Sequence, residues 1–298
     1  MNIDGELMPP AQARISVFDR GFLYGDSVYE VVRTYGGVPF EIEAHLRRLV
    51  RSADRIGLSL PWGPARTAGE VERTLEAARG EDPPDPEVAP WNAGERYVRV
   101  VMTRGAGEIG LDPALAVDPK AIVIVQPLHG PPASAYRDGV KACVVGVEHL
   151  SPRAVDPSAK TGNYLPNVLA VREARAAGAH EAFMLDRDGF VTEGTTSNVF
   201  AVRRGAVATP PLAAGILEGV TRGLVLRLAR ELGVPAAEEP LRPADLEAAD
   251  EVFITSSARE MLPVTRLGDR LVGSGRPGPV TRRLHGAFRE RASRPARP

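Results

Sequence analysis

The chain has 298 residues, enough to bury the core of one large domain or of two modest ones. Its formal net charge of −1 gives no reason to expect nucleic acid or an anionic membrane surface as a partner. No apolar run approaches the ~20 residues that cross a bilayer, and the N-terminus lacks the basic and apolar regions of a secretory signal. The one cysteine, Cys143, excludes an internal disulfide and lies in an apolar run, so we predict a core residue in a cytoplasmic protein.

The first half opens with turn-rich sequence and then alternates strand and helix patterns. Strands are predicted where β-branched and aromatic residues gather, over 28–35, 96–104 and 121–128. Gly36-Gly37 predicts a hairpin turn after the first strand. A helix is predicted from Glu43 to about Ile56, because one helical face carries Leu46, Leu49, Val50 and Ala53. The segment 80–95 is proline-rich, acidic and non-periodic, which predicts an exposed loop.

The second half mixes strands and helices again. Strands are predicted over 140–150, 181–186, 190–194, 197–202, 206–210 and 251–255. Helices are predicted over 163–178, 218–232 and 279–292. Runs of strands with segregated helices are typical of an α+β fold, not of a doubly wound sheet. We predict a smaller N-terminal domain, an interdomain linker and a larger C-terminal domain, at 1–128, 129–135 and 136–298.

Lysine is rare in this chain, and chemistry that needs a primary amine therefore has three candidates, Lys120, Lys141 and Lys160. Lys120 and Lys141 lie beside charged turns, where we expect them to face solvent. Lys160 follows the loop 150–159 and precedes TGNYLPN. An aldehyde cofactor needs an amine held where it can form a Schiff base. Lys160 is the best candidate, although a solvated loop lysine is the alternative from the residue alone.

Three separate segments could bind an anion. Arg48 lies one position before Leu49, off the apolar stripe; if it turns inward, its guanidinium needs an anion, and a phosphate suits its fork. The helix start at 219–221 offers free amides and a hydroxyl, and Ser256 and Ser257 repeat this arrangement after a strand end. Taken singly, each of these segments also fits an ordinary solvated arginine or helix cap.

Glu193 falls at the end of a predicted strand among small and hydroxyl residues. A buried carboxylate there would need a positive partner, which the protonated ring nitrogen of pyridoxal phosphate would supply. An exposed strand-end glutamate is the alternative. The five histidines are scattered without ligand spacing, so no metal site is predicted.

Taken together, these residues resemble the class IV aminotransferase family of fold type IV pyridoxal-phosphate enzymes. The resemblance covers nearly the whole chain through DRGFLYGDSVYEVVRTYGG, HLRRLVRSA, YVRVVMTRG, AKTGNYLPNVLA, EAFMLDRDGFVTEGTTSNVF, GILEGVTR and EVFITSSAREMLPV. It implies a two-domain α+β fold, pyridoxal 5'-phosphate as cofactor, and a homodimer or higher homo-oligomer in which a partner loop closes each pocket.

The resemblance also implies roles for individual residues. Lys160 resembles the Schiff-base lysine that moves a proton between the substrate Cα and the cofactor. Glu193 resembles the partner of the pyridine nitrogen, and Tyr164 the phenol on the cofactor's 3-oxygen. The residues implied to hold the phosphate and pack on the ring are Arg48, Val220, Thr221, Ser257 and Leu217. The residues implied to line the substrate site are Tyr24, Tyr29, Val31, Tyr97, Arg99, Ser256 and Ala258.

Substrate choice rests on fewer residues. Tyr97 and Arg99 match the Tyr-x-Arg pattern of branched-chain aminotransferases, and KTGNYL around Lys160 also resembles them. Val31 stands where these enzymes have glycine and instead resembles D-amino acid and some (R)-amine transaminases. The resemblance therefore favours ping-pong transamination of L-branched-chain amino acids with 2-oxoglutarate. The alternatives are a D-amino acid or (R)-amine transaminase, an aminodeoxychorismate lyase, and a non-catalytic pyridoxal-phosphate-binding protein.

Overall fold

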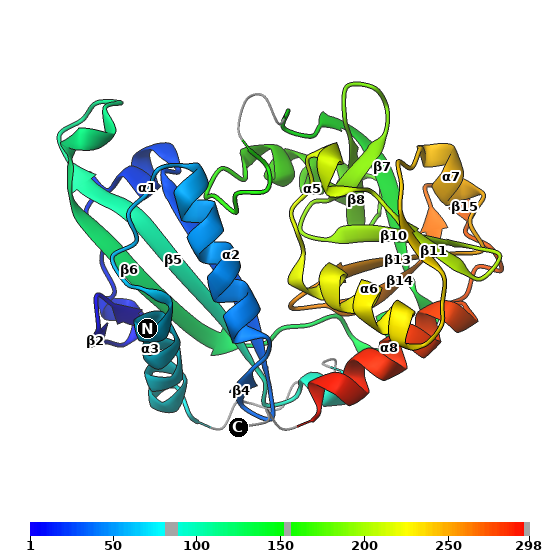
Figure 1. The fold of residues 1–298 in the computed structure, drawn as a ribbon, viewed down its shortest axis with the longest axis horizontal. Helices are drawn as coiled ribbons and strands as arrows, with labels where there is room; N and C mark the ends of the chain where they lie inside the picture. Colours follow the sequence, from blue (N-terminus) through cyan, green and yellow to red (C-terminus); the bar gives the residue numbers. More distant parts are fainter. Residues whose placement is uncertain (81–88, 152–155, 295–298) are drawn as a thin grey trace. The chain divides into compact units, whose positions relative to one another are not determined.

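The computed structural model describes residues 1–80, 89–151 and 156–294 (Figure 1). The chain divides into two compact units. Unit 1 comprises the described residues of Met1–Pro86, Trp91–His129 and Ala159–Tyr164, and unit 2 those of Glu87–Pro90, Gly130–Ser158 and Leu165–Pro298. The predicted boundaries place Ala159–Tyr164 in the second domain, but main-chain hydrogen bonds hold this segment in unit 1: Tyr29 donates to Lys160 and Gly162 donates to Ser27.

The described part of unit 1 is built on one six-stranded sheet with the strand order β2-β1-β6-β5-β3-β4. The strands are β1 (Asn2–Ile3), β2 (Glu6–Leu7), β3 (Ser27–Tyr35), β4 (Val38–Pro39), β5 (Arg96–Gly107) and β6 (Ala116–Pro127). All of their pairings are antiparallel, and the hairpin predicted at Gly36-Gly37 joins β3 to β4. Side chains alternate between the two faces of such strands, so each strand contributes to two different surfaces.

Two helices of unit 1, α2 (Ile42–Arg55) and α3 (Pro64–Ala77), pack against the sheet (Figure 1). The predicted helix over 43–56 is confirmed as α2, whose Leu46, Leu49 and Ala53 are buried while Val50 is half-buried. The core between these helices and the sheet includes Val28, Val32, Val98, Val100, Met102, Trp62 and Val71. A shorter helix, α1 (Arg20–Tyr24), precedes β3.

The described part of unit 2 contains a mixed nine-stranded sheet with the order β12-β11-β10-β13-β14-β7-β8-β9, and β15 pairs with β14. The strands are β7 (Val140–Glu148), β8 (Glu181–Leu185), β9 (Val191–Gly194), β10 (Asn198–Arg203), β11 (Ala206–Thr209), β12 (Ala236–Glu238), β13 (Glu251–Ser256), β14 (Glu260–Leu267) and β15 (Arg270–Leu271). Both hairpins predicted here are confirmed, as β8–β9 and β10–β11. This largely antiparallel arrangement confirms an α+β fold.

Helices of unit 2 cover different parts of its sheet. The helices are α4 (Ala133–Asp138), α5 (Leu165–Ala176), α6 (Val220–Glu231), α7 (Pro243–Glu247) and α8 (Pro279–Ala292). Helices α6 and α8 pack against each other and against β13, while α5 packs on β7 and β8 (Figure 1). Cys143 lies under α5 in an apolar cluster with Ala170, Ala174 and Met184, as predicted for a core residue.

Two loop predictions need correction. In the predicted exposed loop over 80–95, residues 81–88 lie outside the described residues, but Ala89 and Asn92 are buried and Pro90–Asn92 forms a 3-10 turn. The predicted linker over 129–135 runs into α4, which begins at Ala133 after Pro132. A proline before the first helical turn fits its lack of an N–H donor, so here it starts a helix instead of extending a linker.

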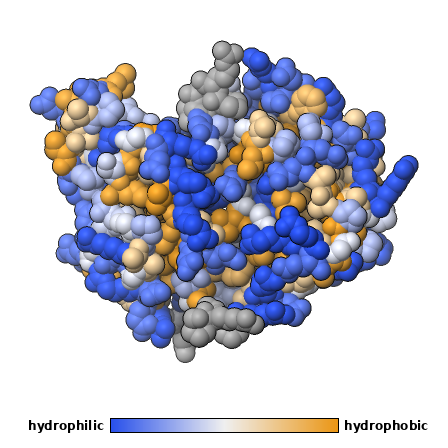
Figure 2. Space-filling view, viewed as in Figure 1, coloured by the Kyte–Doolittle hydropathy of each residue, from blue (hydrophilic) through white to orange (hydrophobic). Residues whose placement is uncertain are grey.

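Exposed apolar side chains of unit 1 gather around α1 and the connection between β5 and β6, where the surface shows apolar patches (Figure 2). They include Val17, Phe18, Phe22, Ile109 and Leu111, which are 50–81% exposed. Such a grouping is more than the scattered apolar residues of an ordinary surface. No helix in the described ranges is both long and apolar enough to span a membrane.

Candidate active site

The main chain of Lys160 is fixed by two elements of unit 1. Its carbonyl accepts a hydrogen bond of 3.0 Å from the Tyr29 N–H on β3. Its own N–H donates to the Ser52 Oγ on α2, also at 3.0 Å. The next residue, Thr161, bridges to Val28. The lysine therefore projects from backbone that is attached to a strand and a helix, although the sequence around it is typical of a loop.

The amine of Lys160 has aromatic and phenolic neighbours. Its Nζ donates to the Tyr164 hydroxyl at 3.1 Å and lies 4.4 Å from the centre of the Tyr29 ring. Among the described residues, it makes no ion pair with a carboxylate. Lys120, by contrast, pairs with Asp118 and Asp4, and Lys141 pairs with Asp269.

The prediction that Lys120 and Lys141 face solvent is therefore only partly right. Their side chains are 22% and 27% exposed, and each amine is paired with a carboxylate. Ion pairing and its hydrogen bonds hold an ammonium in its charged form. Of the three lysines, Lys160 is the one whose amine is surrounded by groups that do not neutralise it.

Four residues predicted to line the substrate site lie on one face of the unit 1 sheet. In the antiparallel register of β3 and β5, Val31 lies opposite Arg99, and Arg33 lies opposite Tyr97. Tyr29 is two residues before Val31 and so faces the same side. The Arg99 guanidinium lies 3.9 Å from the centre of the Tyr29 ring, a cation–π contact. Burial raises the pKa of Tyr29, so its phenol stays protonated at neutral pH.

The opposite face of β3 carries a buried charged cluster that the sequence did not predict. Glu30 accepts hydrogen bonds of 2.7 Å from both Nε and Nη2 of Arg48, and its carboxylate also lies 2.7 Å from His45 Nδ1. Burial alone would raise the pKa of Glu30, but Arg48 and His45 lower it to about 2. Burial lowers the pKa of His45, which is therefore neutral at pH 7. Arg48 is therefore buried, and the Glu30 carboxylate is one anion that pairs with it.

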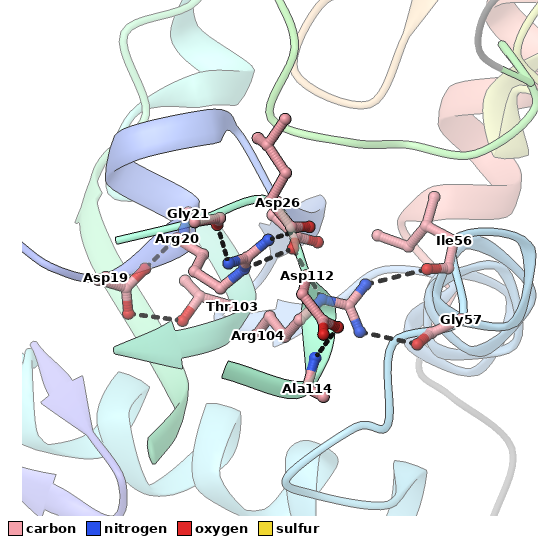
Figure 3. A network of polar contacts seen from close by, with 12 residues as sticks. Asp19, Arg20, Gly21, Asp26, Ile56, Gly57, Thr103, Arg104, Asp112 and Ala114 are labelled. Atoms are coloured by element: carbon pink, nitrogen blue, oxygen red, sulfur yellow. Dashed lines mark hydrogen bonds and ion pairs between the residues drawn. The ribbon is translucent and has the colours of Figure 1, made fainter. Parts of the chain in front are cut away.

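Tyr24 ends the short helix α1, whose position is set by a polar network (Figure 3). Asp19 caps the helix by accepting from the Gly21 N–H at 2.7 Å. The Asp26 carboxylate pairs with Arg20 at 3.2 Å and with Arg104 at 2.7 Å. Arg20 also donates to the carbonyls of Gly110 and Leu111, and Arg104 to those of Ile56 and Gly57. One carboxylate thus ties α1 to the end of β5, the β5–β6 connection and the end of α2.

In unit 2, Glu193 is held by three donors or partners. Its Oε2 accepts from the Leu217 N–H at 3.1 Å and from the Asn198 amide at 3.2 Å. Its Oε1 lies 3.2 Å from His149 Nε2. The carboxylate is 13% exposed and thus partly covered at the end of β9. The fixed orientation of Glu193 favours a positioned acceptor over a mobile surface glutamate.

The predicted anion-binding segments of unit 2 lie at element ends. Val220 is half-buried and Thr221 is buried in the first turn of α6, after Gly219 at the N-cap. A side chain at Gly219 would collide with Asn198, so glycine is required at this close approach. Ser256, Ser257 and Ala258 are half-buried where β13 turns into β14.

The structure thus brings the predicted residues together in separate groups. Unit 1 groups Lys160 and Tyr164 with Tyr29, and unit 2 groups Glu193 with Leu217. The sequence missed Glu30, His45, His149 and Asn198. A glutamate inside the apolar run VYEVV was the available signal for Glu30, whereas nothing in the sequence indicated His149. In the described ranges, no cluster of three His, Cys, Asp or Glu side chains could hold a metal ion.

Comparisons with known proteins show which family the chain is similar to. The family model for class IV amino-transferases matches residues 27–267. A Methanocaldococcus jannaschii protein assigned as a branched-chain-amino-acid aminotransferase is 38% identical over 97% of this chain and 94% of its own length. A D-alanine aminotransferase of Bacillus licheniformis is 33% identical over 96% and 94%. The crystal structure of the Escherichia coli branched-chain amino acid aminotransferase superposes with a TM-score of 0.88 at 30% identity, covering 97% of this chain and 92% of that one.

Proposed function

Because the chain belongs to the class IV aminotransferase family, we propose that it transfers the amino group of L-branched-chain amino acids to 2-oxoglutarate in two half-reactions. Enzymes of this family use pyridoxal 5'-phosphate. The observation that carries the proposal is the environment of Lys160. Its amine donates a hydrogen bond to the Tyr164 hydroxyl and has no carboxylate partner among the described residues. The names of two relatives, the Methanocaldococcus jannaschii protein and the Escherichia coli branched-chain-amino-acid aminotransferase, support the choice of substrate.

The residues present fit the cofactor. Lys160 would carry it, and Tyr164 would donate to its 3-oxygen. The Glu193 carboxylate, oriented by Leu217 and Asn198, would accept a hydrogen bond from the pyridine nitrogen. The residues that would bind its phosphate and pack on its ring are Val220, Thr221, Ser257 and Leu217, together with Arg48, which would bind the phosphate while two of its nitrogens stay bonded to Glu30. When bound, the cofactor supplies an electron sink for the charge left on the substrate Cα as its proton departs.

The chain's own groups would then bind the substrate and move its proton. The Lys160 amine would hold and return the proton at the substrate Cα. Tyr97 would contact the substrate carboxylate, and Arg99 would orient a neighbouring tyrosine, a role that its stacking on Tyr29 supports. Tyr24, Ser256 and Ala258 would complete the walls. Val31 would narrow the side-chain pocket by the volume that separates valine from glycine.

The experiment uses the visible colour of the protein. The purified holoenzyme is expected to be yellow, to bleach with L-leucine and to regain its colour with 2-oxoglutarate. Lys160→Ala should lose the yellow band, while the matched control Lys141→Ala keeps it. An unchanged spectrum in Lys160→Ala would refute the lysine assignment.

A second candidate is a D-amino acid or (R)-amine transaminase. The D-alanine aminotransferase relative and the valine at position 31 favour it. Bleaching with D-alanine or an (R)-amine but not with L-leucine would replace the first proposal by this one. A yellow protein that releases pyruvate from aminodeoxychorismate would be a lyase, and one whose colour no amine changes would be a binding protein.

The proposal includes a homodimer in the cytoplasm. The apolar residues around α1 and the β5–β6 connection, among them Phe22 and Leu111, support an interface between two copies. The single, buried Cys143 suits a reducing compartment. Sedimentation analysis should give twice the mass of the chain, and Leu111→Asp should shift the protein towards monomer. Cell fractionation would test the compartment.

A further inference from the structure

Two turns of unit 2 lie side by side, where the neighbouring strands β10 and β13 begin and end. The turn over Thr195–Ser197 joins β9 to β10, and the turn over 257–259 joins β13 to β14. Strands β10 and β13 pair antiparallel, with Asn198 opposite Thr255, so the end of the first turn adjoins the start of the second. The first turn follows Glu193, and the second carries Ser257 and Ala258.

The side chain of Arg259 joins these two turns. Its Nη2 donates to the Thr196 hydroxyl at 2.7 Å, in the first turn. Its Nε and its backbone N–H both lie 3.3 Å from the Ser256 hydroxyl, at the start of the second turn. Its Nη1 lies 3.0 Å from the buried carboxylate of Glu181. The guanidinium is 16% exposed, so it is largely shielded from solvent.

Glu181 binds the first turn as well as Arg259. Its carboxylate accepts from the backbone N–H and the hydroxyl of Thr195 and from the Ser197 hydroxyl, at 2.5–3.1 Å. Burial alone would raise the pKa of Glu181, but the Arg259 charge and these donors lower it. The carboxylate is therefore ionised at neutral pH. It is a charged group in the protein interior that is bonded to Thr195 and Ser197 of the first turn, to Arg259 of the second and to the Ala182 N–H.

A buried ion pair usually adds little to the free energy of folding. Apolar residues of similar volume often stabilise a fold as well or better, because two charges must lose their hydration. The β13–β14 turn also ends at Glu260, whose φ of 55° is unusual for a residue other than glycine. Such backbone persists when its surroundings fix it, and it is found at binding sites. Both features indicate a turn whose geometry is fixed by its surroundings.

We propose that Arg259, held by Glu181, is a positioning residue that fixes the Ser256–Ala258 turn for anion binding. The inference rests on the proposed function, in which Ser257 binds the cofactor phosphate and Ser256 and Ala258 line the substrate site; it adds that this turn also receives the carboxylate of the substrate. Phosphate and carboxylate are both oxyanions that need converging hydroxyl and N–H donors. Arg259 does not touch the anion; it holds Ser256 and Thr196 so that the donors converge.

The test compares Arg259→Met and Arg259→Lys with the wild-type enzyme. Arg203→Met is the matched control, because Arg203 forms an exposed ion pair with Asp245 in the same unit. Three quantities are measured: the Kd for pyridoxal phosphate binding to the apoenzyme, the Michaelis constant (KM) for the keto-acid acceptor 2-oxoglutarate with the holoenzyme, and the thermal unfolding temperature. A weakened phosphate contact raises the Kd, and a weakened carboxylate contact raises the KM with a smaller change in kcat.

We expect Arg259→Met to raise the Kd or the KM between about tenfold and a hundredfold, with Arg259→Lys intermediate and Arg203→Met unchanged. A lower unfolding temperature with unchanged Kd and KM would show a merely structural role and overturn the proposal. If Arg259→Met does not fold, the double variant Glu181→Gln/Arg259→Met removes both charges, and the same weakened binding is expected of it; wild-type affinity in it would refute the inference. A wild-type chain that binds no pyridoxal phosphate would instead refute the proposed function.

Discussion

Glu30→Gln is expected to destabilise unit 1 strongly, because it leaves a charge buried without its counter-ion. The carboxylate of Glu30 is fully buried and forms the forked pair with Arg48. The Arg48 side chain is 5% exposed, so water cannot replace the lost partner. Removing one member of a buried ion pair costs about 3–5 kcal/mol. The matched control is Glu43→Gln on α2, the helix that carries Arg48, where an exposed pair with Arg47 contributes at most about 0.5 kcal/mol.

The pKa of Glu30 sets how this effect depends on pH. Its depression from 4.5 to about 2 corresponds to roughly 3 kcal/mol, at 1.36 kcal/mol per pKa unit. Because the folded-state pKa is below the unfolded one, this stability is fully present above about pH 4.5 and is lost as the pH falls towards 2. His45 acts in the same direction, since its lowered pKa makes the unfolded chain bind more protons below its ordinary value.

Urea unfolding followed by tryptophan fluorescence can measure this, because both tryptophans, Trp62 and Trp91, belong to unit 1. At pH 7 we expect Glu30→Gln to unfold at a much lower urea concentration than wild type and Glu43→Gln to match wild type. Between pH 5 and pH 3 the gap between Glu30→Gln and wild type should narrow by about 2 kcal/mol, as the wild-type carboxylate loses its advantage. A loss below 1 kcal/mol at pH 7, or a gap independent of pH, would refute the reasoning.

Three further predictions address specificity, the polar network and the cysteine. Val31→Gly should widen the side-chain pocket and raise the kcat/KM ratio of L-leucine to L-alanine about tenfold; an unchanged ratio in steady-state kinetics would remove Val31 from the pocket. Asp26→Asn leaves two guanidiniums without their carboxylate, so limited proteolysis should cut the connection near Gly110 faster than in wild type, and equal rates would contradict the network's role. Cys143 is buried and burial raises its pKa, so a thiol reagent should label it quickly only after denaturation; rapid labelling of the native protein would contradict its place in the core.

Much of the fold could be predicted because its elements carry strong local patterns. The strand over 28–35 and the helix over 43–56 are found within a residue of their predicted bounds, since alternation and a helical apolar face are local properties. The helix predicted over 279–292 coincides with α8. Sequence could not predict that Arg48 would be buried, because its position lies off the apolar stripe. The cause is Glu30, 18 residues away, and only the packing of α2 on β3 brings the two together.

The same limit explains the residues that were missed in unit 2. Arg259 and Glu181 are far apart in the sequence. The residues around each of them predict only an ordinary turn or strand, with no sign of a partner elsewhere. Their relation appears only when three segments meet in the folded unit: β8, the β9–β10 turn and the β13–β14 turn. A charged residue in an apolar strand, such as Glu30 or Glu181, is the one local signal that such a cluster exists, because a carboxylate is buried only with partners.

The three lysines show how far each kind of reasoning reaches. Scarcity of lysine limits the candidates for amine chemistry to three, but the surrounding sequence describes all three as loop or strand-end residues. The partners separate them: hydrogen bonds to Asp118 raise the pKa of Lys120, and Lys141 is paired with Asp269. Lys160 has a phenol at 3.1 Å and a backbone held at both its N–H and its carbonyl. An amine that must form and break a covalent bond needs both a fixed origin and freedom from a neutralising carboxylate, and Lys160 meets both conditions.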